Sequence, residues 1–317
     1  MQRISKRAPA VGRTGGNVRR AWRGLAGFAA VFAALTGLAF VPAQAVIHVA
    51  ASTTDLGSIA SAVGGDQVEV VTIARPGADP HRVEVLPSYM VRVSRAQVYL
   101  KVGLGLDQWA DQIIDGSHNS KVLVVDCSAN VNVLEKPTGK VDASMGDVHP
   151  NGNPHYWLDP RNAAIAGQTI AEGLAKIDPA HAADFDKHAE EFSKACNELT
   201  ARGAMQMKSM PSHDILTYHR SWAYFGDAFG LNVVSTIEPI PGIPPTARHL
   251  QELVDVIKQK KIPVVIEEPY FSEDGGEFLT RQAGIRIVHA SGSCDDIKAG
   301  AYLAHIQAIL DQVAGGK

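Results

Sequence analysis

From residue 46 onward, short apolar runs rich in β-branched residues alternate with longer stretches in which apolar positions recur at helical spacing. This alternation is typical of βαβ units and indicates an α/β fold with mainly parallel sheets. Two series of elements can be separated. The first places strands at 46–50, 68–74, 97–102 and 121–126, and helices at 56–63, 88–95 and 106–114. The second places strands at 214–218, 232–237, 263–267 and 285–289, and helices at 220–229, 246–260, 273–283 and 296–313.

A long helical pattern lies between the two series. An Ala-rich helix is predicted at 161–177, after which Asp178 and Pro179 supply an N-cap and a first-turn proline. About thirty residues follow with a single glycine, Gly203, and one helix of that length would span about 45 Å. Two shorter helices broken at Gly203 are the alternative. We expect two α/β lobes, each with a mainly parallel sheet flanked by helices, at 46–178 and 210–317, joined by a rigid linking helix at 179–209.

The first 45 residues follow a different pattern. They contain seven basic residues and no acidic one, with a largely apolar stretch at 25–41 before Pro42. A basic start, an apolar segment and small residues at a cleavage point predict a secretory signal peptide at 1–45, cleaved after Ala45. A transmembrane anchor is the alternative, because the 17 residues of the apolar stretch approach the minimum membrane span. The signal peptide predicts an exported, periplasmic protein.

The charge and composition of the chain exclude some classes of function. The formal net charge of −3 is an average, because residues 46–317 hold 23 basic and 33 acidic residues, a net charge of −10. An apolar content of 45% with 20% charged residues is typical of a globular protein. An acidic body without a basic cluster argues against a nucleic acid as partner. The cysteines Cys127, Cys196 and Cys294 are too few for a disulfide scaffold or a thiolate zinc knuckle, and any pairing among them stays open.

Three of the twelve histidines share a context that favours a metal site. His81 lies in a Gly/Pro turn after a predicted strand, His155 lies between the first series of strands and a predicted helix, and His219 follows a predicted strand. All three, drawn from both lobes, are therefore expected to project from the carboxyl ends of strands. Ligands of open α/β sheets bind at the carboxyl ends of the strands, so these side chains are expected to converge. Three neutral imidazoles and one oxygen ligand complete a tetrahedral site suited to zinc.

The oxygen ligand is expected from the end of a strand in the second lobe. Asp295 follows the strand at 285–289 and is our first candidate, with Asp296 beside it and Glu268 after the strand at 263–267 as alternatives. Cys294 adjoins Asp295 and is a further candidate as a soft ligand.

The sequence around these residues resembles a known family. The segments GADPHRVEVLPSYM, QVYLKVGLGLDQW, NPHYWLDPRNA and YHRSWAYFGDAFGL are similar to the zinc/manganese-binding class of solute-binding proteins of bacterial ABC importers, and the resemblance runs through nearly all of the chain after residue 45. It implies two α/β lobes joined by a rigid helix, with a metal in the cleft between them. By position, His81, His155 and His219 match the first three ligands of that family.

Three features of the chain bear on the metal and on the ligands that the resemblance implies. Manganese-binding members carry a carboxylate at the third ligand position, so His219 implies zinc, in keeping with the preference of imidazole for zinc. The interval from Asp295 to Tyr302 is shorter than in the family, which leaves the fourth ligand open. The surface loop predicted at 136–154 lacks the long His-rich insertion of many zinc-specific members, with Asp142, Asp147 and His149 only.

We therefore expect a monomeric, high-affinity zinc-binding protein that captures Zn²⁺ in the periplasm and delivers it to an ABC transporter permease in the inner membrane. A periplasmic metallochaperone is a further expected partner, with the loop at 136–154 passing zinc to His155. The alternatives are a manganese-binding homologue, a three-His zinc hydrolase with Glu267 or Glu268 as its base, and a binding protein for an organic ligand. A closed four-ligand shell would leave no position for a reacting water, which argues against an enzyme.

Overall fold

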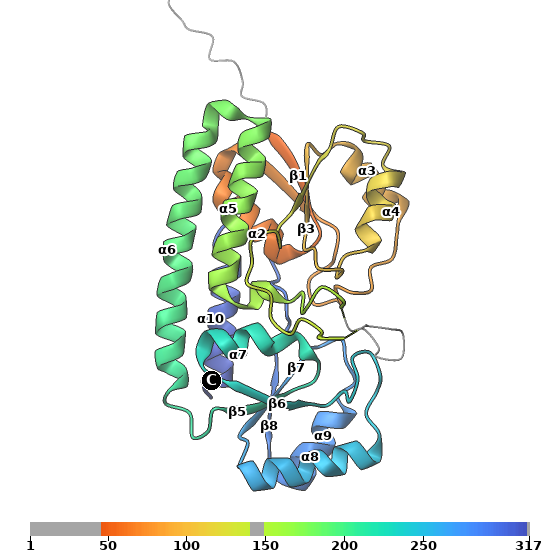
Figure 1. Cartoon of the computed structure of the whole chain (residues 1–317), viewed down its shortest axis with the longest axis vertical. Coiled ribbons are helices and arrows are strands. Elements are labelled where there is room, and N and C mark those ends of the chain that lie inside the picture. The colour runs from red at the N-terminus through yellow and green to blue at the C-terminus, as the bar shows by residue number, and fades with distance from the viewer. Residues whose placement is uncertain (1–45, 140–148, 316–317) are drawn as a thin grey trace, which may run out of the picture. The chain divides into compact units, whose positions relative to one another are not determined.

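The computed structural model describes residues 46–139 and 149–315, so the predicted signal peptide at 1–45 and the centre of the loop at 136–154 lie outside the described residues (Figure 1). Two four-stranded sheets form the body of the protein, and every strand pairing within them is parallel. All eight predicted strands are present, with each boundary within two residues of the prediction. The predicted fold of two α/β lobes is confirmed.

The first sheet has the strand order β2-β1-β3-β4, and the second repeats this arrangement with the order β6-β5-β7-β8. The strands of the first sheet are β1 (Ile47–Ala51), β2 (Val68–Thr72), β3 (Val98–Lys101) and β4 (Leu123–Asp126). Those of the second are β5 (Asp214–Thr217), β6 (Asn232–Thr236), β7 (Val264–Glu267) and β8 (Arg286–His289). In each sheet the strand that comes first in the sequence, β1 or β5, lies between the second and the third strand. The second strand is therefore added on one side of it, and the third and fourth strands are added on the other side.

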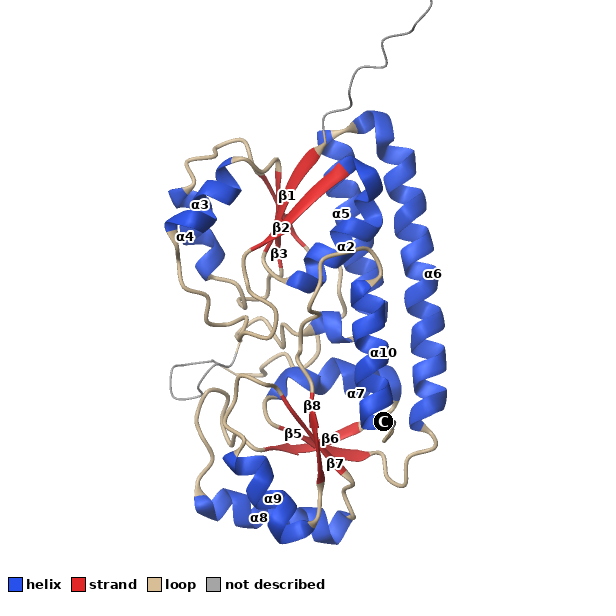
Figure 2. Ribbon diagram, turned by 180° about the vertical axis from the view of Figure 1, so that it is seen from behind, coloured by secondary structure: helices blue, strands red, loops and turns tan. Residues whose placement is uncertain are grey.

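Helices cover both faces of each sheet (Figure 2). The helices are α2 (Thr54–Gly64), α3 (Pro87–Ser94), α4 (Trp109–Gly116), α5 (Pro160–Ile177), α6 (Ala182–Met207), α7 (Ala223–Phe229), α8 (Ala247–Lys260), α9 (Asp274–Ala283) and α10 (Ala301–Val313). Alternate residues of β1 show the two faces. Val49 and Ala51 pack in a cluster with α2 and α5, while Ala50 packs in another with α3 and α4. This is the continuous apolar pattern expected of a parallel strand buried on both sides.

Helix α6 runs along both lobes (Figure 2) and contacts α5 and α2 at one end and α7 and α10 at the other. Its 26 residues span about 39 Å, and the preceding 3-10 turn, Pro179–His181, accounts for the rest of the predicted segment. The helix is not broken at Gly203. A Cβ atom there would meet Phe229 and Leu310 at 2.6–2.8 Å, so the glycine allows α6 to pack closely against α7 and α10.

One buried apolar cluster continues from the first lobe through α6 into the second. Its members include Leu56, Leu174, Phe192, Leu199, Phe225, Ile266 and Leu310. Helix α10 belongs to the second lobe by sequence but also contacts α2. The division of the chain at 178 and 210 therefore stays a prediction, while the shared core ties the two sheets together.

The predicted helix at 296–313 begins later than expected, at Ala301. The residues before it form a loop that is held against α2. The Cys294 N–H donates to Asp55 Oδ1 at 3.1 Å, and the Ser58 hydroxyl donates to the carbonyl of Lys298 at 2.8 Å. Gly300, with a φ of +88°, then turns the chain into the helix. Within the part of the chain that the structure describes, no helix is long and apolar enough to span a membrane.

Candidate metal centre

The structure brings together His81, His155 and His219. One ring nitrogen from each lies within 4.8 Å of the other two. The ring centroids are 5.0 Å apart for His81 and His155, 5.5 Å for His81 and His219, and 5.6 Å for His155 and His219. Imidazoles bound to one tetrahedral ion through nitrogens at about 2.0–2.1 Å would have centroids about 5 Å apart. The three rings therefore already have the spacing of a metal site.

A different local structure places each of the three histidines at this centre. His219 lies two residues beyond the end of β5, close to the predicted strand end. His81 lies nine residues beyond the end of β2, in a Gly/Pro turn, and His155 follows no strand but precedes the 3-10 turn Tyr156–Leu158. That turn is anchored where Tyr156 Oη donates to the carbonyl of Val102 at 3.0 Å and Trp157 Nε1 donates to the carbonyl of Gly292 at 2.7 Å. The strand-end rule thus holds for His219, and loops place the other two.

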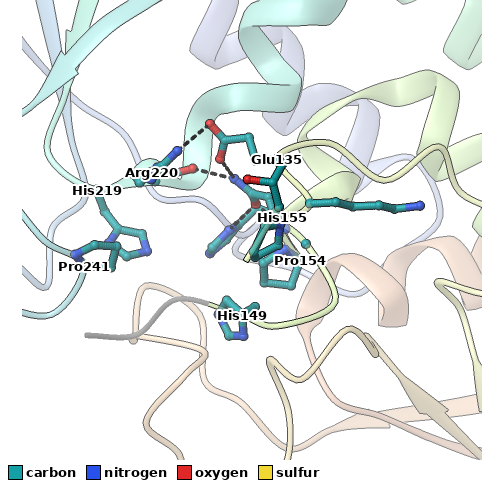
Figure 3. A pocket seen from close by; sticks show the side chains of 12 residues that line it. Glu135, His149, Pro154, His155, His219, Arg220 and Pro241 are labelled. Carbon is teal, nitrogen blue, oxygen red and sulfur yellow. Dashed lines mark hydrogen bonds and ion pairs between the residues drawn. The ribbon is translucent and has the colours of Figure 1, made fainter. Parts of the chain in front are cut away.

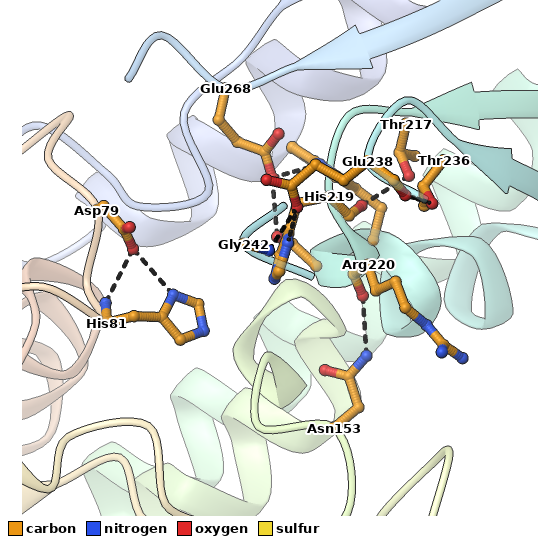
Figure 4. A network of polar contacts seen from close by, with 12 residues as sticks. Asp79, His81, Asn153, Thr217, His219, Arg220, Thr236, Glu238, Gly242 and Glu268 are labelled. Atoms are coloured by element: carbon orange, nitrogen blue, oxygen red, sulfur yellow. Dashed lines mark hydrogen bonds and ion pairs between the residues drawn. The ribbon is translucent and has the colours of Figure 1, made fainter. Parts of the chain in front are cut away.

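The Nδ1 atom of each histidine has its own partner, and Figure 4 shows the partners of His81 and His219. His81 Nδ1 donates to Asp79 Oδ1 at 2.9 Å, and His219 Nδ1 donates to Glu238 Oε2 at 2.8 Å. His155 Nδ1 donates to Asn153 Oδ1 at 2.8 Å. These acceptors fix the tautomer with the proton on Nδ1, which leaves Nε2 as the ligand atom. The Nε2 atoms of His81 and His155 are buried and have no hydrogen-bond partner among the residues that the structure describes, as expected of ligand atoms for a cation.

Two of these pairs share one local structure. The sequences Asp79-Pro80-His81 and Asn153-Pro154-His155 both place an acceptor two residues before a histidine. The same oxygen also accepts the backbone N–H of the histidine, at 2.9 Å from His81 and 3.0 Å from His155. Each motif is a closed Asx turn that holds backbone and ring together.

Asn153 also links the two lobes. Its amide donates to Glu135 Oε2 at 2.9 Å and to the carbonyl of Arg220, beside His219, at 2.8 Å. Arg220 in turn donates to Glu135 Oε1 at 3.0 Å, and Tyr224 Oη donates to the carbonyl of Asn153 at 2.7 Å. This network fixes the position of His155 relative to His219.

Burial sets the protonation of the centre. Desolvation, followed by the neighbouring His81 and His219, lowers the pKa of His155 well below its usual value. His155 is therefore a neutral ligand at physiological pH. Although burial acts to raise it, hydrogen bonds and charge from His81 hold the pKa of Asp79 below its usual value. Asp79 is thus ionised and can balance part of the charge of a bound cation.

The predicted oxygen ligands do not join this group. Among residues 46–139 and 149–315, the candidate metal-holding group contains the three histidines alone. Asp295 is exposed, on the loop that is held against α2, and Asp296 pairs with Lys298 at 2.9 Å. Glu268 is buried, but its Oε1 accepts from Ser221 Oγ at 2.8 Å and from Trp222 Nε1 at 3.0 Å. Desolvation is the main cause that raises the pKa of Glu268 to about 8.

The cysteines also lie apart from the centre. Cys127, Cys196 and Cys294 are buried free thiols, so none of them forms a disulfide with another. Burial raises the pKa of all three thiols. Cys294 Sγ donates to the carbonyl of Asp296 at 3.2 Å. A thiol held protonated in this way is a poor metal ligand, because metals bind the thiolate.

A cavity of about 350 Å³ opens beside the centre (Figure 3). His149, His155 and His219 line it, together with Glu135 and Arg220. A second cavity of about 520 Å³ lies against His81, His219 and Glu238. The centre is therefore reached from two sides.

Sequence reasoning missed the residues that support the ligands. The repeated Asx-Pro-His motif was a signal for Asp79 and Asn153, because both residues stand at the same distance from a candidate ligand. Glu238 left no such signal, since it lies 19 residues from His219 and reaches it from the end of β6.

The fold and the centre define a two-lobed metal-binding protein of the solute-binding class. The model of the ZnuA family, described as "Zinc-uptake complex component A periplasmic", matches residues 49–316, and the chain belongs to this family.

Individual relatives carry different metals in their names. The chain is 26% identical over 275 residues to "Iron-binding protein YfeA" of Yersinia pestis, covering 83% of this chain and 84% of that protein. It is 25% identical over 243 residues to "Manganese-binding lipoprotein MntA" of Halalkalibacterium halodurans, covering 76% and 77%. It is 32% identical over 117 residues to "High-affinity zinc uptake system protein ZnuA" of Brucella abortus, covering 37% and 35%.

Solved structures agree on the fold. A crystal structure of ZnuA superposes with a TM-score of 0.75 at 23% identity, over 86% of this chain and 99% of that one. The binding protein FpvC of Pseudomonas aeruginosa, in complex with Mn²⁺, gives a TM-score of 0.71 at 26% identity, over 85% and 97%. The relatives and structural neighbours are metal-binding proteins rather than enzymes.

Proposed function

We propose that this protein captures Zn²⁺ in the periplasm with high affinity and delivers it to the permease of an ABC importer in the inner membrane. The observation that carries the proposal is the convergence of three imidazoles, each with its Nδ1 proton committed to an oxygen acceptor. Such a set presents three nitrogen ligands. Nitrogen ligands suit zinc better than manganese, which prefers carboxylate and carbonyl oxygens.

The metal is the part of this proposal that the relatives leave open. Zinc, manganese and iron all occur in their names. The choice of zinc therefore rests on the donor atoms, and above all on His219, because the family resemblance implies a carboxylate at this position in manganese binders. A manganese- or iron-binding protein is the second candidate, because two relatives with long matches bear those names.

Delivery requires that the metal be released. The apolar cluster that runs through α6 into both sheets resists wide hinge motion, so a modest closing of the lobes is the expected conformational change. The signal peptide at 1–45, the lobes at 46–178 and 210–317, the monomeric state and a metallochaperone partner remain parts of the proposal.

The test is metal analysis of the exported protein as purified, followed by competition between zinc and manganese. We expect one zinc per chain and retention of zinc in excess manganese. His219→Ala should lose the zinc, while His213→Ala serves as the control, because His213 is an exposed histidine before β5. Tight manganese binding with weak zinc binding would overturn the choice of metal.

A further inference from the structure

The centre has three ligands where zinc takes four. The nearest carboxylates, those of Asp79 and Glu238, already accept the Nδ1 protons of His81 and His219. A zinc site without a catalytic role is expected to have a fourth protein ligand, as structural zinc sites do. A further side chain near the three rings is therefore needed as the fourth ligand. It should come from a segment other than those that carry Asp295 and Glu268.

His149 lies beside two of the three rings, those of His81 and His155. Its ring stacks on that of His81 with a centroid distance of 5.3 Å, and its centroid is 6.5 Å from that of His155. The first distance matches the separation of about 5 Å expected for two imidazoles on one tetrahedral ion. The Nε2 atom of His149 is buried, and the residue lines the same cavity as His155 and His219 (Figure 3).

The backbone holds His149 close to the centre. The N–H of Gly152 donates to the carbonyl of His149 at 3.2 Å, which closes a turn with Pro150 at its second position. Asn153, the acceptor for the ring of His155, follows this turn directly and its N–H donates to the carbonyl of Leu134 at 3.0 Å. The sequence His149-Pro150-Asn151-Gly152-Asn153-Pro154-His155 thus carries two histidines on one anchored segment.

We propose that His149 is the fourth metal ligand, so that the centre is bound by four imidazoles and no oxygen. This inference rests on the proposed function. Binding would draw the ring of His149 toward that of His155 by roughly 1.5 Å, from 6.5 Å to the spacing of about 5 Å in a tetrahedral site. His149 lies in the loop at 136–154, which is predicted to hand over zinc, and it would act as a permanent ligand instead of a transient one.

Charge supports a shell of this kind. Four neutral imidazoles leave the two positive charges of the ion uncompensated within the shell. Asp79 and Glu238, each one imidazole away from the metal, supply two negative charges through His81 and His219. A set of four nitrogens would also select against manganese, since no hard oxygen ligand is offered.

The test compares His149→Ala, His149→Asp and the control His213→Ala in the full chain. Two quantities are measured, zinc affinity by competition with a chromophoric chelator and the visible spectrum of the Co²⁺-loaded protein. We expect His149→Ala to weaken zinc binding about 100-fold and to change the cobalt absorption bands. His149→Asp should shift the zinc-to-manganese affinity ratio toward manganese by at least about tenfold.

The outcomes separate this inference from the function on which it rests. If the unaltered protein binds zinc while His149→Ala keeps the affinity and cobalt spectrum of His213→Ala, the fourth ligand is overturned and the zinc-binding function stands. If the unaltered protein does not bind zinc, the proposed function is overturned and this ligand with it.

Discussion

Oδ1 of Asp79 accepts two hydrogen bonds from His81, one from its backbone N–H and one from its ring Nδ1, both at 2.9 Å. The proline between the two residues restricts the backbone, so the turn, the ring orientation and the tautomer are set together. Asn153 forms the same pair of bonds with His155. The ligand geometry therefore arises from a three-residue motif used twice, before any metal is bound.

The first prediction concerns Asp79. Asp79→Ala removes both bonds to His81 and is expected to weaken zinc binding about 10–100-fold, as for other residues that orient metal ligands. Asp79→Asn keeps an acceptor oxygen and should lose less than Asp79→Ala. Asp115→Ala, at an exposed aspartate in α4, is the matched control. Zinc titration with a competing chelator measures the effect, and equal affinities for Asp79→Ala and Asp115→Ala would show that the turn does not support the ligand.

The second prediction concerns Glu238, which is 5% exposed and bonded to His219 Nδ1. Its Oε2 also accepts the backbone N–H of Gly242 at 3.2 Å. Glu238→Gln retains an acceptor but removes the charge that raises the basicity of the imidazole, so we expect zinc affinity to fall about tenfold. Isothermal titration at constant pH checks this value. Unchanged zinc affinity would mean that the carboxylate charge has no part in binding.

The third prediction concerns the close packing of the linking helix α6 at Gly203. At Gly203 the new methyl group of Gly203→Ala would meet Phe229 and Leu310 at 2.6–2.8 Å. Alanine favours helices by about 1 kcal/mol over glycine, but overpacking costs about 1–3 kcal/mol, so we expect a net loss of stability. Denaturant unfolding measures it, with Met205→Ala, 70% exposed on the same helix, as control. A stabilised Gly203→Ala variant would show that the contact with α7 and α10 is loose.

The fold was largely predictable from the sequence because its strands are buried on both faces. Residues such as Val49 and Val265 belong to apolar runs that leave few alternative structures. The start of α10 was not predictable, because the helical spacing after Asp296 continues a pattern that tertiary contacts interrupt. A hydrogen bond donated by the Ser58 hydroxyl and one accepted by the Asp55 carboxylate, both on α2, hold this segment as a loop.

Only the residues of the candidate site that stand in recognisable local motifs could be predicted from the sequence. His81 and His155 stand in recognisable turns, and His219 ends a strand. The fourth ligand was predicted from the position of a strand end, and Asp295 instead lies exposed on a loop whose position depends on packing against α2. Contacts between lobes, such as Asn153 with Arg220, have no signal in a single sequence.

The last prediction concerns Glu267, whose side chain is buried at the end of β7 against Gly276 in the first turn of α9. Desolvation, and then the charge of Glu268, raises its pKa to about 7 from an ordinary 4.5. The folded protein therefore holds this proton more tightly than the unfolded chain does. The stability that the protonated group contributes is fully present below about pH 4.5 and is lost as the pH rises to about 7.

Glu267→Gln removes this dependence while keeping the shape of the side chain. Near pH 4.5 the variant and the unaltered protein should unfold at similar denaturant concentrations. At pH 8 the variant should be more stable by up to roughly 3 kcal/mol, since one pKa unit corresponds to about 1.4 kcal/mol. Denaturant unfolding at several pH values, without metal, provides the comparison. Glu252→Gln, at an exposed glutamate in α8, is the control, and a pH-independent difference between Glu267→Gln and the unaltered protein would show that folding does not raise the pKa of Glu267.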